Sequence, residues 1–414
     1  MTPTSAGNDS GTKRTTLDAE NVYNSISHLE RWIDGRYEGW DPYDGLNNFK
    51  VQNIKLGSPY VQMGLVQLHR LSPINLRALF GVEKGVDTKG LAVFVQAYLT
   101  LHSATGEERY LRQATELSEM IIGNSLKKSV GDHAWASHYF PFIAADKGAL
   151  TPSVPDIIGT SNVLKALSLL QLTGREERLD EVIGSCQAYL RRMVEHRDSH
   201  AYFMYTPEWK GKIVPNASAE ALGAIASSLR ARPNDELRVL CDEVLQTVLR
   251  LQREDGSWVY SIYPNGREYL QHDFHQGYMI SGLLSYRDLA PAELRDDIDN
   301  AIGRALTFYK GLFLEDGRSL YRAPQRFPVD IHNQSQGIIT FTQAAELKGD
   351  IVRIDMAHTI AEWTIKNMQD RNGFFYYQKW PMVTNKIPFM RWSQAWMLLA
   401  LASLFAHERN GRIL

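Results

Sequence analysis

The hydrophobic and polar positions along the chain predict two alternating kinds of helix. One kind is apolar around most of its circumference after a polar first turn, as in residues 271–284, QHDFHQGYMISGLL. A helix that is apolar on several sides is buried on more than one face, so we expect its polar first turn to open onto a pocket. The other kind carries a single apolar stripe. In residues 17–34 the apolar positions are 22, 26, 29 and 33, which is the spacing of an amphipathic helix.

The change from a polar to a small or apolar residue recurs at a nearly constant spacing. It falls at residues 89–90, 162–163, 220–221, 276–277, 336–337 and 394–395, at intervals of 73, 58, 56, 60 and 58. An amphipathic helix accompanies each unit, at 107–122, 176–194, 235–251, 293–312 and 351–368, with 17–34 as the sixth. Near-equal units of this size are typical of one repeat architecture. The sequence therefore predicts an all-α fold, an (α/α)6 barrel or six-hairpin toroid, with the apolar helices as its inner ring.

Two links between an outer and an inner helix share the pattern Q-x-x-x-G-x-aromatic, QREDGSW at 252–258 and QDRNGFF at 369–375. The pattern resembles the QW motif of α/α-toroid proteins such as terpene cyclases. Aromatic, alternating stretches at 202–205, 257–261 and 374–377 predict short β-hairpins. We expect these hairpins at the cavity mouth, on the barrel end where the inner helices begin.

Composition and charge narrow the class of protein. We expect residues 1–15 to be a disordered tail and residues 16–414 to form a single barrel domain. The formal net charge is -2 and there is no long basic run, which disfavours a nucleic-acid or membrane-surface partner. No apolar run approaches the roughly 20 residues of a membrane span, and the N-terminus lacks the apolar segment of a secretion signal. We therefore expect a cytoplasmic protein, and its oligomeric state stays open.

The candidate chemistry is concentrated in a D-x-H pattern that occurs in two consecutive repeats, Asp273-Phe274-His275 and Asp330-Ile331-His332. Because the inner helices begin at one barrel end, we expect both pairs at one cavity, with the two imidazoles facing each other across it. A neutral imidazole accepts a proton near pH 7, and a carboxylate tunes that role. The alternative is a structural role at the helix starts. The spacing does not match helical metal-binding motifs, so we expect neither a metal nor another cofactor.

Further candidate residues gather near the same barrel end. The loop 39–47, GWDPYDGLN, alternates aromatic and acidic residues, as a cleft would that presents carboxylates beside sugar-stacking rings; the alternative is a well-formed turn. We expect Asp44 to act together with the D-x-H residues. We expect the substrate to contact Trp40, Asp41, Tyr43, Glu220, Trp258, Gln276, Gln336, Arg391 and Trp392.

The aromatic members of this set have a specific expected role. Trp40, Tyr43, Trp258 and Trp392 are predicted to line the cavity mouth as platforms for sugar rings, although large aromatic side chains also serve as core filling. Arg391, next to the last of them, suits a carboxylate or an anionic sugar.

Five segments resemble the VpsJ-like polysaccharide-biosynthesis family. They are residues 39–47, SPINLRALFGVEKGVDTKGLA at 72–92, DFHQG at 273–277, DIHNQSQG at 330–337 and MRWSQAWMLLAL at 390–401. The resemblance spans about residues 37–405. It implies a six-hairpin toroid with a role in the production of surface or extracellular glycans, and it assigns no catalytic residue.

These observations predict a carbohydrate-active enzyme that acts on an oligosaccharide, a polysaccharide or a glycan precursor by acid–base chemistry at the barrel mouth. Three reactions stay open: hydrolysis by two of the candidate carboxylates, epimerisation by His275 and His332, as in the N-acylglucosamine 2-epimerase group, and β-elimination from a uronate. Two other classes compete with this one. They are a non-catalytic glycan-binding scaffold and a terpene-cyclase-like toroid, which the absence of a D-x-D-D motif disfavours.

Overall fold

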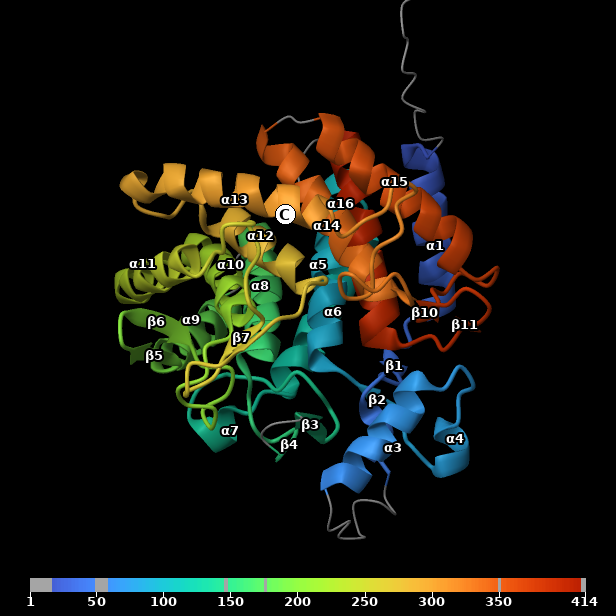
Figure 1. Ribbon diagram of the computed structural model, residues 1–414, viewed down its shortest axis with the longest axis horizontal. Coiled ribbons are helices and arrows are strands. Elements are labelled where there is room, and N and C mark those ends of the chain that lie inside the picture. The colour runs from blue at the N-terminus through green and yellow to red at the C-terminus, as the bar shows by residue number, and fades with distance from the viewer. Residues whose placement is uncertain (1–16, 49–58, 145–147, 175–176, 349–350, 411–414) are drawn as a thin grey trace, which may run out of the picture.

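A computed structural model describes residues 17–48, 59–144, 148–174, 177–348 and 351–410, and within them the chain forms two concentric rings of six helices (Figure 1). The tail expected at residues 1–15 lies outside the described residues. The inner ring consists of α5 (Thr88–Thr105), α8 (Ile157–Gly174), α10 (Pro215–Ala231), α12 (His275–Tyr286), α14 (Ile331–Lys348) and α16 (Trp396–Asn410). The outer ring consists of α1 (Ala19–Ile33), α6 (Glu108–Gly123), α9 (Glu177–Arg192), α11 (Asp235–Arg250), α13 (Arg295–Lys310) and α15 (Ile351–Met368).

The inner ring is closed. Each inner helix contacts the next one along the chain, and α16 contacts α5. The N-terminal helix α1 packs against α16, so the blue and red ends of the chain lie side by side (Figure 1). The first helix therefore supplies the outer partner of the last inner helix. The prediction of an (α/α)6 barrel is confirmed.

The two kinds of helix are buried as their patterns predicted. In α5 every residue from Lys89 to Leu101 is buried, because this helix is covered by two inner neighbours and an outer one. In α1 only one stripe is buried, built on Val22, Ile26, Leu29 and Ile33. The single apolar stripe of an outer helix covers the inner ring and leaves the opposite face in water.

The two Q-x-x-x-G turns connect two pairs of neighbouring outer helices, α11 with α13 and α15 with α1. The Gln252 amide donates to the carbonyls of Gly256 in its own turn and Ala301 in α13, at 3.0 and 2.9 Å. The Gln369 amide donates in the same way to its own turn and to Ser25 in α1. Gly373 has a φ of +107°, and a Cβ there would lie 2.1 Å from a carbonyl oxygen of α1. These turns need glycine both for the positive φ and for close approach to the neighbouring helix.

Short strands lie around the barrel ends, and the predicted hairpins are only partly correct. The strands are β1 (Glu38–Gly39) with β2 (Gly85–Val86), β3 (Phe142–Ala144) with β4 (Gly148–Leu150), β5 (Val194–Arg197) with β6 (His200–Phe203), β7 (Ser261–Ile262) with β8 (Glu268–Tyr269), and β9 (Val329–Asp330), β10 (Gln378–Lys379) and β11 (Thr384–Asn385) in one sheet. The expected stretch at 202–205 falls partly in β6, whereas 257–261 enters a strand only at its last residue and 374–377 ends just before β10.

The missing strands have a physical reason. Gln276 of α12 makes hydrogen bonds to both the amide and the carbonyl of Trp258, at 3.0 and 2.9 Å. Gln394, just before α16, holds the backbone of Phe375 in the same way, at 2.8 and 2.9 Å. The backbone groups of Trp258 and Phe375 are therefore already satisfied by side chains and do not pair with another strand.

The segment between α1 and α5 leaves the ring and covers part of the barrel end. It contains the 3-10 turn η1 (Asp44–Leu46) and the helices α3 (Pro59–Leu71) and α4 (Arg77–Phe80), which lie beside β1 and β2 in Figure 1. Three further short elements are α7 (Lys127–Val130), the 3-10 turn η2 (Ala292–Leu294) and the π-helical turn η3 (Met390–Ala395) that leads into α16. Across the described residues, no helix combines the length and apolarity that a membrane span requires.

Candidate active site

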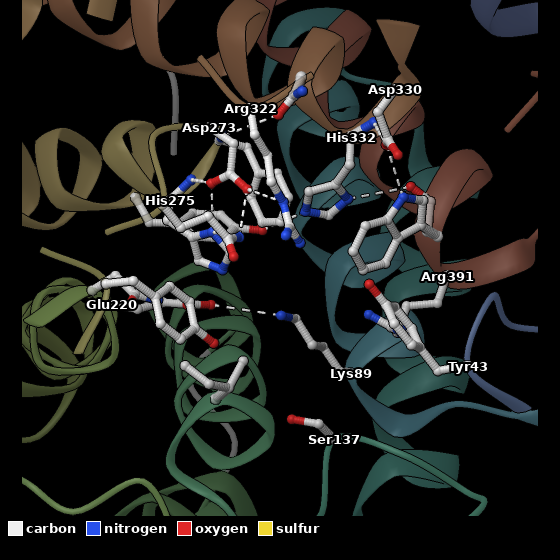
Figure 2. A pocket seen from close by; sticks show the side chains of 18 of the residues that line it. Tyr43, Lys89, Ser137, Glu220, Asp273, His275, Arg322, Asp330, His332 and Arg391 are labelled. Carbon is white, nitrogen blue, oxygen red and sulfur yellow. Dashed lines mark hydrogen bonds and ion pairs between the residues drawn. The ribbon is translucent and has the colours of Figure 1, made fainter. Parts of the chain in front are cut away.

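A cavity with a volume of about 200 Å³ lies at the barrel end where the inner helices begin (Figure 2). Its walls include side chains from α5, α8, α10, α12, α14 and the η3 turn before α16. The structure therefore confirms that the first turns of the inner helices surround one cavity. Of the predicted site residues, the cavity is lined by Tyr43, Glu220, Asp273, His275, Asp330, His332, Arg391 and Trp392.

The first D-x-H pair forms a carboxylate–imidazole unit open to the cavity. The Asp273 Oδ1 atom lies 2.6 Å from His275 Nδ1 and also accepts from the His275 backbone amide at 3.1 Å. Its other oxygen accepts from Gln271 Nε2 at 2.6 Å. Within the described part of the chain no residue hydrogen-bonds to His275 Nε2, and the side chain keeps 15% of its surface exposed. When Nδ1 donates to the carboxylate, Nε2 is left to accept or deliver a proton.

In the second D-x-H pair, neighbouring protein groups occupy both carboxylate oxygens and both imidazole nitrogens. The Asp330 oxygens accept hydrogen bonds from Trp392 Nε1 at 3.0 Å, Gln378 Nε2 at 2.7 Å and the His332 amide at 2.9 Å. The His332 ring lies 2.6 Å from the Tyr278 hydroxyl through Nε2 and 3.3 Å from the Trp392 carbonyl through Nδ1. Nδ1 therefore donates to the carbonyl, and the Tyr278 hydroxyl donates to Nε2.

Burial sets the protonation preferences of this second pair. Burial holds the pKa of His332 well below its usual value, and the nearby positive charges of Lys89 and Arg391 lower it further. Burial also raises the pKa of Asp330, against the hydrogen bonds from Gln378, His332 and Trp392. His332 is therefore a neutral imidazole with both nitrogens engaged.

The two imidazoles share one aromatic neighbour, which corrects the expectation that they face each other across the cavity. The Phe274 ring stacks on His275 with centroids 4.2 Å apart and meets His332 edge-on at 4.4 Å. Both histidines come from neighbouring helices, α12 and α14. Phe274, the middle residue of the first D-x-H turn, thus contacts both imidazoles.

Glu220 and Lys89 form a second polar unit in the cavity. Figure 2 shows them extending toward each other from α10 and α5, with Lys89 Nζ 3.9 Å from Glu220 Oε1. That oxygen accepts from Asn162 Nδ2 at 2.5 Å, whereas the buried Oε2 has no hydrogen-bond partner among the described residues. Burial lowers the pKa of Lys89, and Glu220 opposes that shift. Glu220 was predicted from the sequence, and Lys89 was missed although it opens the first repeat.

Arg391 is less available to a substrate than the sequence indicated. Its Nε and Nη2 atoms donate to Asp41 Oδ2 at 2.9 and 2.5 Å, and Nε also lies 3.3 Å from Asp87 Oδ2. Two carboxylates thus balance its charge. Asp41 is 1% exposed and contributes nothing to the cavity lining, so the prediction that it contacts substrate is contradicted by its position.

Asp44 is also placed away from the cavity, which corrects its predicted catalytic role. Its Oδ1 accepts from Arg77 Nε at 2.6 Å and its Oδ2 from the Asp41 amide at 2.9 Å. Both side chains of the Asp44–Arg77 pair are fully buried. Burial raises the pKa of Asp44 to about 7, while Arg77 opposes the shift. Arg77 Nη2 donates to the Asp41 and Pro42 carbonyls of the same loop and Nη1 to the His69 carbonyl of α3, so this pair holds the 39–47 loop in shape against α3.

Of the four aromatic residues predicted as sugar platforms, two line the cavity and two do not. Tyr43 and Trp392 line the cavity and meet edge-on with centroids 5.6 Å apart. Trp258 is 1% exposed, with its indole donating to the Val248 carbonyl at 2.8 Å, and it belongs to the core. Trp40 lies outside the cavity lining and donates to the Val82 carbonyl at 3.1 Å. The core-filling alternative is correct for Trp258, whereas Trp40 is half-buried and packs against the edge of the core.

The two predicted glutamines do not reach the cavity. The Gln276 amide is occupied by the Trp258 backbone. Gln336 lines a second, deeper space of about 70 Å³ on the barrel axis, where its Oε1 is buried without a hydrogen-bond partner among the described residues. Glu220 and Tyr278 line both spaces. The polar residues that precede the small or apolar residue in each repeat thus have different roles. Gln276 holds a turn, Gln336 lines the axial space, and Glu220 lines the cavity.

Several cavity residues were not found from the sequence. They include Arg70 of α3, Tyr205, Tyr260, Tyr278, Tyr321 and Arg322. Tyr205 and Tyr260 belong to the aromatic stretches that were placed at the cavity mouth, but they were not singled out as site residues. The others lie outside the D-x-H pattern, because α3 lies outside the ring, Tyr321 and Arg322 lie on a link, and Tyr278 lies one turn inside α12. Among the residues that the structure describes, no group of three or more His, Cys, Asp or Glu is arranged to hold a metal ion.

The sequence matches no protein-family model and no curated protein. Its structure is similar to that of the unsaturated glucuronyl hydrolase from Bacillus sp. GL1, with a TM-score of 0.62, 13% identity and coverage of 94% of this chain and 96% of that one. It is also similar to cellobiose 2-epimerase from Bacillus thermoamylovorans, with a TM-score of 0.60, 11% identity and coverage of 78% and 88%. A third similar structure is the GH76 α-mannanase from Bacteroides thetaiotaomicron, with a TM-score of 0.59, 11% identity and coverage of 77% and 86%. At these identities the likeness shows the (α/α)6 toroid fold.

Proposed function

We propose that the protein is a carbohydrate-active enzyme that performs general acid–base catalysis on a glycan held in the barrel-end cavity. In this proposal His275 and Glu220 transfer protons, and Asp273 orients His275. The proposal is supported by the three similar structures named above, whose names describe two enzymes that hydrolyse carbohydrates and one that epimerises a sugar. The substrate would be an oligosaccharide or polysaccharide.

The observation that carries the proposal is the state of the two proton-transfer groups. Glu220 Oε2 is buried at the cavity with no hydrogen-bond partner among the described residues, and His275 Nε2 is left free by the bond from Nδ1 to Asp273. A buried carboxylate oxygen without a partner is costly unless a ligand or water satisfies it. A carboxylate and an imidazole at one cavity supply the base and the acid that sugar chemistry requires.

Hydrolysis is the reaction that this arrangement favours. Epimerisation by a pair of histidines would need a second imidazole with a free nitrogen, and His332 has both of its nitrogens engaged. Glu220 retains an oxygen that can act on a water molecule, with the Lys89 ammonium 3.9 Å from the other oxygen to balance its charge. We therefore propose that Glu220 activates water and that protonated His275 donates to the leaving oxygen.

The test is incubation of the protein with a panel of polysaccharides and measurement of three products. New reducing ends would report hydrolysis, ultraviolet absorbance would report an unsaturated uronate, and deuterium incorporated from solvent into sugar C–H bonds would report epimerisation. We expect new reducing ends, reduced about 10²–10⁴-fold by Glu220→Gln. Glu268→Gln, on the exposed strand β8, is the matched control and should leave the rate unchanged. A panel without turnover, or full activity in Glu220→Gln, would overturn the proposal.

We further propose that the enzyme takes part in the production of a polysaccharide. This role is supported by the motifs at 273–277, 330–337 and 390–401, which resemble those of VpsJ-like proteins. The first two contain the D-x-H turns and the third contains η3, so the resemblance falls on the segments that build the cavity. Deleting the gene in its host should then alter the amount or chain length of a cell-surface or extracellular glycan, which sugar analysis would measure.

A further inference from the structure

Arg70 is a cavity cation whose charge the protein leaves unbalanced. It lines the cavity from the last turn of α3, and no carboxylate lies within 4.0 Å of it among the described residues. Its Nη2 donates to the Tyr321 hydroxyl at 2.6 Å and its Nη1 to Gln67 Oε1 at 3.2 Å. Its Nε is buried without a hydrogen-bond partner in the described part of the chain. The Tyr43 ring, 5.2 Å from the guanidinium, offsets only part of the charge.

The other buried cations of the cavity differ from Arg70 in this respect. Arg391 is bound by Asp41 and lies near Asp87, and Lys89 faces Glu220. Asp330, whose pKa the charge of Arg70 lowers, already accepts hydrogen bonds from three other donors. A partly buried guanidinium without an acidic partner is unfavourable by itself, and an anionic ligand relieves that cost.

A second guanidinium stands beside the first. Arg322 lies 5.6 Å from the Tyr321 ring centroid and lines the same cavity, so Tyr321 is in contact with both arginines. Its Nε is 3.9 Å from Asp273 Oδ2, a long contact, and 39% of its side chain is exposed. Two arginines and the tyrosine between them offer donors to one side of the cavity, next to the Asp273–His275 unit.

We propose that Arg70 and Arg322 form a subsite for an anionic group of the glycan, so that the substrate is an acidic oligosaccharide. A sugar carboxylate fits this chemistry, because guanidinium groups bind carboxylates through paired, charge-assisted hydrogen bonds. This inference rests on the proposed glycan-processing function and names its substrate class. It also replaces Arg391, whose charge is balanced within the protein, as the residue that recognises the acid.

The experiment compares acidic oligosaccharides with their own methyl esters, which keep the sugar backbone and remove the charge. Uronate-containing tetrasaccharides and the corresponding esters are titrated into the full-length protein by calorimetry. We expect each bound acid to bind more tightly than its ester, with a preference that shrinks as salt is added. Arg70→Gln should weaken binding of the acid about 10–100-fold and leave binding of the ester unchanged. Arg322→Gln should do the same to a smaller extent, because that side chain is half in solvent.

Arg326→Gln is the matched control, because Arg326 is an exposed arginine four residues from Arg322 and its loss changes the net charge equally. Melting temperatures check that each variant is folded, and Arg322→Gln tests the subsite even if Arg70→Gln unfolds.

Equal binding of acids and esters, or a parallel loss of both in the arginine variants, would overturn the acidic subsite and leave the proposed enzyme intact. A sulfated neutral oligosaccharide that bound more tightly than the uronates would assign the subsite to a sulfate ester. If no glycan is turned over at all, the proposed function fails rather than the acidic subsite.

Discussion

The two D-x-H turns have the same three-residue pattern in consecutive repeats and opposite surroundings. In the first, one nitrogen of His275 is held by Asp273 and the other is free at the cavity. In the second, His332 is 1% exposed and both of its nitrogens are occupied. The difference comes from two residues around the second turn. The Trp392 indole donates to Asp330 and its carbonyl accepts from His332 Nδ1, and the Tyr278 hydroxyl donates to His332 Nε2. A repeated motif can thus supply a chemical group in one repeat and a structural one in the next.

The strongest way to break this comparison is to remove each imidazole in turn. We expect His275→Ala to lower turnover about 10²–10⁴-fold while the melting temperature stays near that of the wild type. His272→Ala is the matched control, since it removes an imidazole that does not line the cavity. His332→Ala should act through stability. If it lowered turnover as much as His275→Ala without lowering the melting temperature, the two turns would be functionally alike.

A second prediction concerns the carboxylates. Asp330→Ala would leave Trp392 Nε1 and Gln378 Nε2 without their acceptor in a buried region. Each unsatisfied donor costs about 1–3 kcal/mol, so we expect a loss of roughly 2–6 kcal/mol in the free energy of unfolding measured with urea. Asp273→Ala removes the partner of a side chain that reaches solvent, so its effect on stability should be smaller and its effect on turnover larger. The reverse order would contradict the assignment of the two carboxylates.

A third prediction uses pH. Because the folded-state pKa of His332 lies well below the ordinary value of 6.5, the unfolded chain takes up this proton first as the pH falls. The contribution of His332 to stability is therefore fully present above about pH 6.5 and is lost as the pH drops toward the folded pKa, by up to about 1.4 kcal/mol per pH unit. Urea unfolding between pH 7 and 5 should show a shallower pH dependence in His332→Gln than in the wild type. Identical slopes would mean that His332 is not held neutral.

The smallest expected effect concerns the hydrogen bond between Tyr278 and His332 in the second turn. Tyr278→Phe removes the hydroxyl that donates to His332 Nε2 at 2.6 Å and keeps the ring. We expect a loss of about 0.5–1.5 kcal/mol in unfolding free energy. A double-mutant cycle should show that this loss disappears in a His332→Phe background and persists in His275→Ala. Coupling of equal size to both histidines would show that Tyr278 does not distinguish the two turns.

Much of the fold followed from local pattern. The spacing of about 58 residues and the contrast between Leu91–Leu101 and the striped helix α1 predicted two rings of helices. The same pattern placed Glu220, Asp273, His275, Asp330 and His332 at one cavity, because inner helices that run in the same direction begin at the same end. The hairpins were predicted less well, since Gln276 and Gln394 satisfy backbone groups that local propensity assigned to strands.

The sequence by itself determined the repeat, the closed ring and the barrel end at which polar first turns would meet, because helical periodicity is a local property. Only the tertiary structure decided which polar groups are free. Asp44 is neutralised by Arg77, 33 residues away, and Arg391 by Asp41, 350 residues away. Arg70 reaches the cavity from outside the ring and meets no acid among the described residues. Charge pairing in a low-dielectric interior depends on which side chains the fold brings within a few ångströms, and no spacing along the chain encodes that distance.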